Sequence, residues 1–180
     1  MKLRTAAILL SLTMAGCSTE PTIPTYAAVA NSPFTVNNYR AADALIAQLG
    51  NRISPTQPII IATIVNIDAL AVSSTFGRLV SEQVSGRFSQ AKYSMVEMKF
   101  RGDVYMKQDQ GELLLTREIK NVAQSQNAQA VIVGTYAESG DTVFVNLKVI
   151  QPNTNLVLAV NDYAFPIDAN IRTMLRKSGK

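Results

Sequence analysis

The amino-acid sequence predicts a fold between the α/β and α+β classes, with a single mixed sheet of about five strands and flanking helices. Two observations predict it. Helical and strand periodicities alternate over residues 39–126, and three strand patterns then follow one another across short turns. Of the 180 residues, 47% are hydrophobic and 17% are charged, the balance of a folded domain. The expected order is α-β-α-β-α-β-β-β-α.

The first half of the domain alternates helices with strands. Residues 39–49 place apolar side chains at helical spacing, with Asn38 as a cap. Residues 59–66 form a run of mostly β-branched side chains, typical of a central strand buried on both faces. The pattern then predicts an amphipathic helix over 75–89 and a strand with one wetter face over 93–99.

The second half begins with a helix and continues as three consecutive strands. Apolar residues recur at near-helical spacing over 112–126. Strand patterns over 130–136, 142–150 and 156–163 are separated only by short turn-forming segments, so they predict an antiparallel meander. A short helix over 167–177 is expected to close the domain.

The first residues have the features of an export signal. Residues 1–16 combine a basic start, an apolar stretch too short to span a bilayer and small residues before Cys17. The segment from Met14 to Cys17 resembles the lipobox of bacterial lipoproteins, with Met14 in place of the usual Leu. Because Cys17 is the only Cys in the chain, we expect it to carry the lipid. The alternatives are a secretory peptide with a chance Cys, or a core Cys in an unprocessed helix.

The lipoprotein interpretation also predicts the organisation and location of the mature chain. Residues 17–38 are rich in Thr, Pro, Ala, Ser and Asn, and we expect the lipidated Cys and a flexible tether there. Residues 39–180 then form the globular domain. Ser18 stands where an Asp would favour inner-membrane retention of a lipoprotein, so the resemblance implies the outer membrane, with the domain facing the periplasm.

Composition argues against several classes of function. Without Lys2 and Arg4 of the signal, 15 basic and 13 acidic residues leave a net charge of +2, and no basic cluster suggests nucleic-acid binding. The chain has no His, and no phosphate-cradling or nucleophile motif is visible. We therefore expect no enzyme activity, no cofactor and no metal. A carboxylate pair for glycoside hydrolysis, assembled by folding, is the enzymatic alternative.

The most distinctive segment for binding is residues 66–78, which follow the central strand and lead into a helix. Binding sites in α/β sheets often lie at such a position. The alternative is ordinary loop chemistry, with Asp68 as a turn former, Ser73 or Ser74 as a helix cap, and Gly77 as a close-packing position. The candidate partner-binding residues of this loop are Asp68, Ser73, Ser74 and Arg78.

The domain resembles the FlgO family of flagellar outer-membrane lipoproteins over about Tyr39 to Leu175. Several short stretches carry the resemblance together, and any one alone would be weak. They are Tyr39-Arg-Ala-Ala-Asp43, Asp68 with Ser73-Ser74-Thr-Phe-Gly-Arg78 and Glu82-Gln83, Glu112-Leu-Leu-Leu-Thr-Arg117, Val133-Gly-Thr-Tyr136, and Asp162-Tyr163.

This resemblance implies a structural lipoprotein, without catalysis, that supports flagellar assembly, stability or motility at the flagellar base. Its implied partners are basal-body or outer-membrane ring proteins, and the exposed strand edge of the meander would allow a homo-oligomer. More distantly, the domain is similar to the N-terminal domain of TolB and to periplasmic lipoproteins that activate cell-wall synthases or build secretion pores. The alternative function is therefore a binding module that regulates a peptidoglycan synthase or an outer-membrane secretion assembly.

Overall fold

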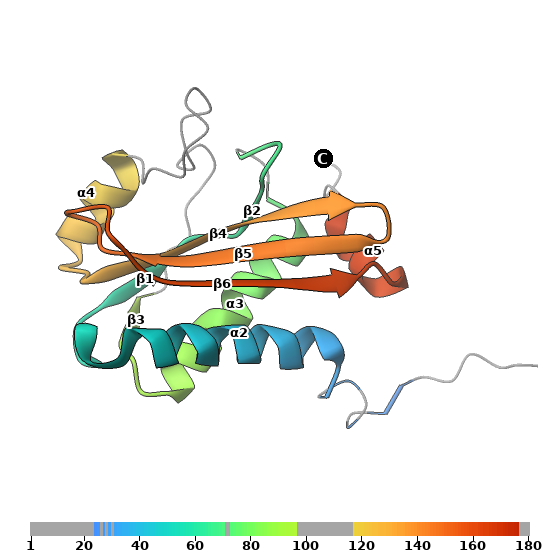
Figure 1. Ribbon diagram of the computed structural model, residues 1–180, viewed down its shortest axis with the longest axis horizontal. Coiled ribbons are helices and arrows are strands. Elements are labelled where there is room, and N and C mark those ends of the chain that lie inside the picture. The colour runs from blue at the N-terminus through green and yellow to red at the C-terminus, as the bar shows by residue number, and fades with distance from the viewer. Residues whose placement is uncertain are drawn as a thin grey trace, which may run out of the picture.

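The computed structural model describes residues 24, 25, 27, 29, 31–70, 73–96 and 117–176, and it shows a mixed α+β fold around one open sheet (Figure 1). Cys17 and residues 97–116 lie outside the described residues. In chain order, the elements are α2 Pro33–Leu49, the 3-10 turn η1 Gly50–Arg52, β1 Ile59–Ile61, β2 Val65–Asn66, α3 Thr75–Gln90, β3 Met95–Val96, α4 Arg117–Ser125, β4 Ala130–Ser139, β5 Thr142–Ile150, β6 Val157–Pro166 and α5 Ala169–Leu175.

The sheet has six strands in the order β3-β1-β4-β5-β6, and β2 also pairs with β4. β1 lies parallel to both β3 and β4, whereas β4, β5 and β6 are antiparallel to one another. Every residue of β1 is buried, as a strand covered on both faces requires. The predicted central strand and the predicted meander are therefore confirmed.

The strand predicted over residues 59–66 is divided in two. Ile61 pairs with Ile132, and Val65 pairs with Thr135. Val65 follows Ile61 by four residues, whereas Thr135 follows Ile132 by only three, so the β1–β2 segment has one extra residue relative to β4, as in a bulge. Ser81 of α3 stabilises the break, because its hydroxyl accepts a hydrogen bond from the backbone N–H of Ile64 (2.9 Å). This division accounts for six strands where about five were expected.

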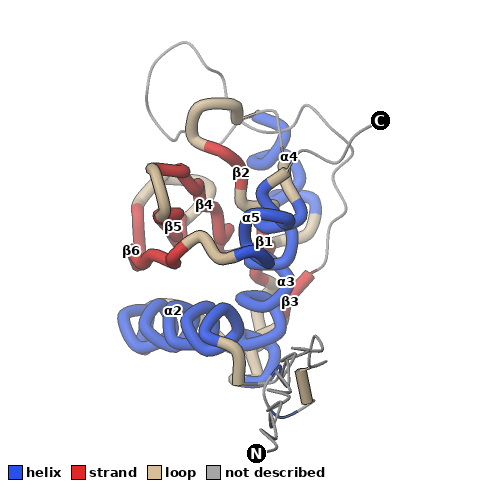
Figure 2. Tube along the Cα trace, turned by 90° about the vertical axis from the view of Figure 1, so that its right-hand side faces the viewer, coloured by secondary structure: helices blue, strands red, loops and turns tan. Residues whose placement is uncertain are grey.

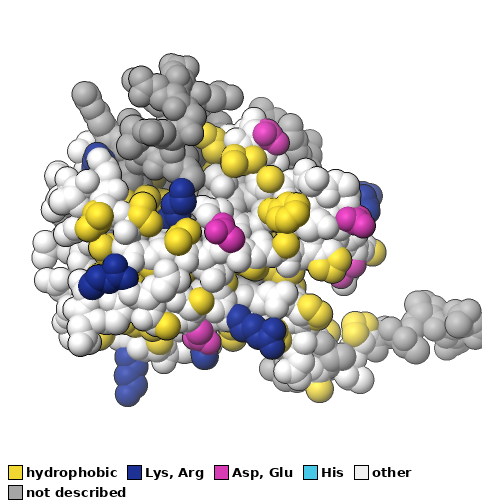
Figure 3. Space-filling view, in the orientation of Figure 1, with side chains coloured by type: hydrophobic (Ala, Val, Ile, Leu, Met, Phe, Trp, Pro, Cys, Tyr) yellow, Lys and Arg dark blue, Asp and Glu magenta, His cyan; other side chains and the backbone are white. Residues whose placement is uncertain are grey.

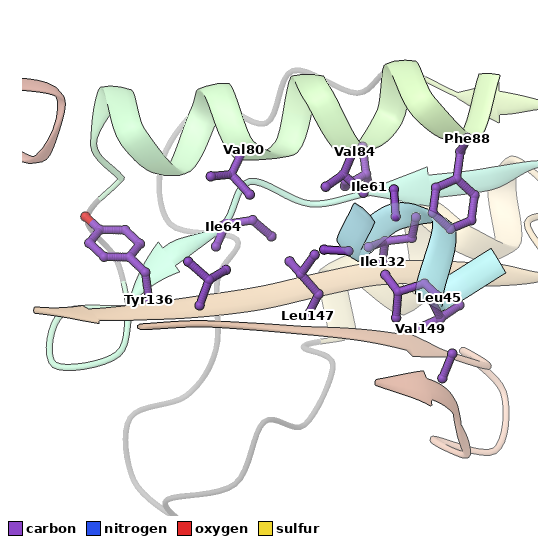
Figure 4. Packing of buried hydrophobic residues seen from close by; sticks show 14 of the residues in the cluster. Leu45, Ile61, Ile64, Val80, Val84, Phe88, Ile132, Tyr136, Leu147 and Val149 are labelled. Carbon is purple, nitrogen blue, oxygen red and sulfur yellow. The ribbon is translucent and has the colours of Figure 1, made fainter. Parts of the chain in front are cut away.

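Helices α2 and α3 cover one face of the sheet, which we call the inner face (Figure 2). Figure 4 shows Val80, Val84 and Phe88 of α3 pointing toward Leu147 and Val149 of β5. These side chains are fully buried. Burial of each aliphatic or aromatic side chain stabilises the fold by roughly 1.5–3 kcal/mol. This core determines how the helices pack on the sheet.

Helix α2 begins earlier than expected. The predicted start was Tyr39 with Asn38 as the cap, but the helix begins at Pro33 and the Ser32 hydroxyl accepts a hydrogen bond from the N–H of Thr35 (3.4 Å). Proline is favoured in the first helical turn, where its missing N–H costs nothing. Residues 33–38, expected as the end of the tether, are thus helical, and Asn38 lies fully buried inside the helix.

Five aromatic rings pack together at one end of the inner face. Phe76 of α3 contacts the rings of Phe34, Tyr136 and Phe165 with centroid distances of 5.2–5.9 Å. Phe165 also contacts Phe34 and Tyr163. The edge-to-face geometry of several of these pairs is the favoured one for aromatic side chains. This cluster joins α2, α3, β4 and β6 into one unit.

The opposite face of the sheet is covered by a described helix at one end only. Ile119 and Ala123 of α4 pack with Val131, Val133 and Ile150 in a second, smaller core. Of the helix predicted over 112–126, residues 112–116 lie outside the described part of the chain. No helix among the residues that the structure describes is long and apolar enough to cross a membrane.

Candidate protein-binding face

The outward side of the meander beyond α4 carries exposed apolar side chains, and we call it the open face. Strand alternation places Phe144 and Asn146 of β5 on this side while Val143, Val145 and Leu147 point into the core. Phe144 is 53% exposed. Figure 3 shows hydrophobic side chains interspersed with separate acidic and basic ones over these strands. Exposed apolar residues grouped in this way are typical of an interaction surface.

A shallow hollow of about 530 Å³ lies on the open face. The hollow lies beside the end of β2, over the central parts of β4, β5 and β6. The loop after β2 and all three strands line it, with Ile67, Thr135, Ala137, Phe144, Val145, Asn146, Asp162, Tyr163 and Ala164. Apolar walls with a few polar groups are the usual composition of a binding site.

Asn146 and Asp162 face each other across β5 and β6 at this hollow. They are directly opposite in the strand register, and the Asn146 Nδ2 group donates a hydrogen bond to Asp162 Oδ1 (2.5 Å). Asn146 Oδ1 is buried and has no hydrogen-bond partner among the residues that the structure describes. Leaving a buried acceptor unpaired costs about 1–3 kcal/mol. The pair therefore orients the Asp162 carboxylate at some cost in stability.

The predicted binding loop separates into a structural part and an exposed part. Ser74 is 2% exposed and its hydroxyl accepts a hydrogen bond from the N–H of Gly77 (3.2 Å), which confirms the capping interpretation. Gly77 allows the start of α3 to lie against the sheet, because a Cβ there would be 1.9 Å from the carbonyl oxygen of Ile64. Its expected role in close packing is confirmed.

The other candidate residues of the loop lie at the surface. Arg78 is exposed, and its guanidinium donates hydrogen bonds to the hydroxyls of Ser73 (3.1 Å) and Thr75 (3.2 Å). Asp68 is exposed, and its backbone N–H is bonded to Asn66 Oδ1. Because the neighbouring Ile67 lines the hollow, the loop and the hollow are continuous. Partner binding by Asp68, Ser73 and Arg78 stays a prediction.

Tyr136 connects this loop to the core. Its ring is 3% exposed and packs on Phe76. Burial raises the pKa of Tyr136 above its ordinary value, and hydrogen bonds with Ser74 and Asn66 oppose this shift. Tyr136 thus has a structural role beneath the loop.

A buried polar network joins α2, α3 and β6. The Tyr163 hydroxyl donates to Asn38 Oδ1 (2.7 Å), and Asn38 Nδ2 donates to Gln83 Oε1 (2.7 Å). Gln83 in turn donates to the Thr35 hydroxyl (3.2 Å). Burial raises the pKa of Tyr163 well above its ordinary value. These hydrogen bonds stabilise the packing of α2 and α3 against β6.

The stretch Tyr39-Arg-Ala-Ala-Asp43, which contributes to the family resemblance, also has a structural role. Arg87 of α3 forms a two-bond ion pair with Asp43 of α2, with distances of 2.8 and 3.0 Å. The Arg87 guanidinium lies 5.6 Å from the centre of the Tyr39 ring. The hydrogen-bonded Asp43 carboxylate raises the pKa of Arg87. These contacts join α2 to α3 at the surface.

The strand edge expected to allow a homo-oligomer is partly occupied. β6 is an edge strand, and the Gln48 side chain accepts a hydrogen bond from the Val160 N–H (3.2 Å) and donates one to its carbonyl oxygen (2.8 Å). A side-chain amide thus takes the place of a neighbouring strand at this residue. Such coverage limits edge-to-edge pairing.

The hollow itself was missed from the sequence, although one signal for it was present. Alternation within 142–150 places Phe144 and Asn146 on one side of a strand, and an aromatic residue on the wetter side is a recognisable feature. Its pairing with Asp162 depends on the strand register, which the sequence alone does not give. Among the described residues, no group of three Asp, Glu, Cys or His side chains could hold a metal ion.

Solved structures define the class of fold. The chain is similar to the C-terminal domains of LpoB from Salmonella enterica and from Escherichia coli, each with a TM-score of 0.53 and 10% sequence identity. Each match covers 76% of this chain and 100% of that chain. At this identity the likeness shows the fold alone. A comparison with curated protein sequences found no match.

The family follows from the sequence. Residues 39–170 match the family described as FlgO protein. The chain therefore belongs to the FlgO family, as the short stretches predicted.

Proposed function

We propose that the protein is a non-enzymatic outer-membrane lipoprotein that supports flagellar assembly, stability or motility as a structural component at the flagellar base. Membership of the FlgO family over residues 39–170 supports the flagellar role. The single structural observation that carries the proposal is the open face, where exposed apolar side chains surround the hollow. A face of this composition is suited to a protein partner.

The proposed anchor is a lipid on Cys17. The Cys thiol would be thioether-linked to diacylglycerol before cleavage of residues 1–16, and further acylation would make the attachment stable. The chain between Cys17 and the start of α2 at Pro33 spans at most about 55 Å when fully extended. The domain would therefore act close to the membrane.

Two substitutions test the anchor and its location. Cys17→Ser should remove the protein from the membrane fraction, because the acylation nucleophile is lost. Ser18→Asp should keep the lipid but move the protein to the inner membrane, whereas the matched Ser18→Ala should stay in the outer membrane. Density-gradient fractionation measures all three. An unchanged location of Cys17→Ser would contradict the proposed anchor.

A chromosomal deletion tests the flagellar role. The deletion strain should lose most of its spreading in soft agar and show fewer or detached flagella by electron microscopy. The wild-type gene should restore both, and the Cys17→Ser gene should not. A deletion strain that swims normally with intact flagella would overturn the proposal.

The alternative, a regulator of a peptidoglycan synthase or of a secretion assembly, is separated by affinity capture of the lipidated protein from gently solubilised outer membranes. Flagellar ring proteins identified by mass spectrometry would support the flagellar role. Capture of a synthase that the purified protein also stimulates would favour the alternative instead.

A further inference from the structure

We infer that the hollow on the open face binds an arginine side chain presented by a protein partner, with the Asp162 carboxylate as the charged contact. The inference rests on the proposed function, because it takes the open face to be a protein-binding surface. It goes further by naming the chemical group that the partner must supply.

The first argument is the charge of the hollow. Asp162 is exposed, and among the described residues that line the hollow it is the only charged one. Its one hydrogen bond is the one from Asn146, and no basic side chain of the described chain pairs with it. Asp162 Oδ2 is therefore available to a cation from outside.

The second argument is the cost of holding this carboxylate in place. Asn146 donates to Asp162, and its own Oδ1 is buried without a partner in the described part of the chain. An unsatisfied buried group in a folded protein calls for a functional or structural reason. Because this hydrogen bond holds Asp162 at the hollow, we assign Asn146 as a positioning residue for the carboxylate.

The third argument is the apolar wall beside the charge. Phe144 and Ile67 line the hollow and are 53% and 51% exposed, and Ala164 lies opposite Phe144 on β6. An arginine has an apolar stem that would cover these side chains while its planar guanidinium reaches the carboxylate. The guanidinium also stacks on aromatic rings more readily than a lysine ammonium does, and Phe144 offers such a ring.

The test is an NMR titration of the mature lipidated chain in detergent micelles with N-acetyl-arginine amide. We expect saturable shifts of the Phe144 and Asp162 backbone amides and of the Asn146 side-chain amide. N-acetyl-citrulline amide, which has nearly the same shape without the charge, and N-acetyl-lysine amide should each bind at least about threefold more weakly.

Two variants locate the site. Asp162→Asn should weaken arginine binding about fivefold, as expected for a partly exposed ion pair. Glu138→Gln is the matched control, because Glu138 is an exposed carboxylate on the same meander but outside the hollow, and it should leave binding unchanged. Thermal unfolding checks that both variants fold.

Other outcomes would overturn the inference. One such outcome is the absence of saturable binding of N-acetyl-arginine amide. Another is binding of the citrulline or the lysine compound as tightly as the arginine compound. A third is that Asp162→Asn and Glu138→Gln change arginine binding equally. Shifts of the same signals with protein concentration alone would identify a second copy of the chain as the occupant. None of these results would affect the soft-agar phenotype of the deletion strain, so failure of this inference is distinguishable from failure of the proposed function.

Discussion

The two faces of the β4–β6 meander differ in what they do for the molecule. On the inner face, Val143, Val145, Leu147 and Val149 are all at most 2% exposed under α2 and α3. On the open face of β5, Phe144 is 53% exposed, and a buried oxygen of Asn146 is unpaired within the described chain. One face therefore stabilises the fold, and the other keeps features that stability alone does not explain.

The largest contrast in stability should come from two residues on opposite faces of β5. Leu147→Ala removes a fully buried side chain and should lower the free energy of unfolding by about 2–5 kcal/mol. Phe144→Ala, on the opposite face, should change it by no more than about 0.5 kcal/mol. Urea denaturation followed by circular dichroism measures both. A large loss for Phe144→Ala would show that the open face also belongs to the core.

A second contrast compares two glycines of α3. Gly77→Ala would place a Cβ against the Ile64 carbonyl and should destabilise the protein by about 1–3 kcal/mol. Gly86→Ala meets no atom within 4 Å and should stabilise it by about 0.4–1 kcal/mol. If thermal unfolding showed the same shift for both, the close approach of α3 to the sheet would be wrong.

The buried network under β6 should make stability depend on high pH. Because burial raises the pKa of Tyr163 in the folded state, its contribution is fully present below the ordinary tyrosine pKa of about 10 and is lost as the pH rises above it. Tyr163→Phe should cost about 1–3 kcal/mol near neutral pH, since it leaves Asn38 Oδ1 unpaired, and less above pH 10. Denaturation curves from pH 7 to 11 test this, and a difference that grew with pH would contradict it.

A small stability effect is also expected at the positioning residue, Asn146. Asn146→Val removes the buried unpaired oxygen together with the hydrogen bond to Asp162, so the free energy of unfolding should change by less than about 1 kcal/mol. Arginine binding should nevertheless weaken. A variant that is several kcal/mol less stable would mean that Asn146 is needed for folding rather than for positioning.

Sequence reasoning recovered the elements whose local pattern agrees with their tertiary environment. The apolar run of β1, the helical face of α3 and its Ser74 cap were all readable because each depends on nearby residues. The start of α2 was missed because the composition of residues 17–38 predicted a tether up to Asn38, although proline after a Ser cap is also a helix-start signal.

The remaining features depend on contacts between distant residues. The break between β1 and β2 is stabilised by Ser81, which lies 17 residues beyond Ile64. The hollow requires Asn146 to pair with Asp162, a matter of strand register that periodicity does not determine. The residues that carry the family resemblance proved largely structural, as Gly77, Tyr136 and Tyr163 show, so they identified the fold better than the site.

The most direct test of the difference between the faces is swimming of the deletion strain complemented with single substitutions at equal protein level. Asp162→Lys reverses the charge of the hollow, and Glu138→Lys makes the same change outside it. We predict that Asp162→Lys folds and reaches the membrane but fails to restore motility, while Glu138→Lys restores it. Full motility with Asp162→Lys would show that the open face does not carry the function.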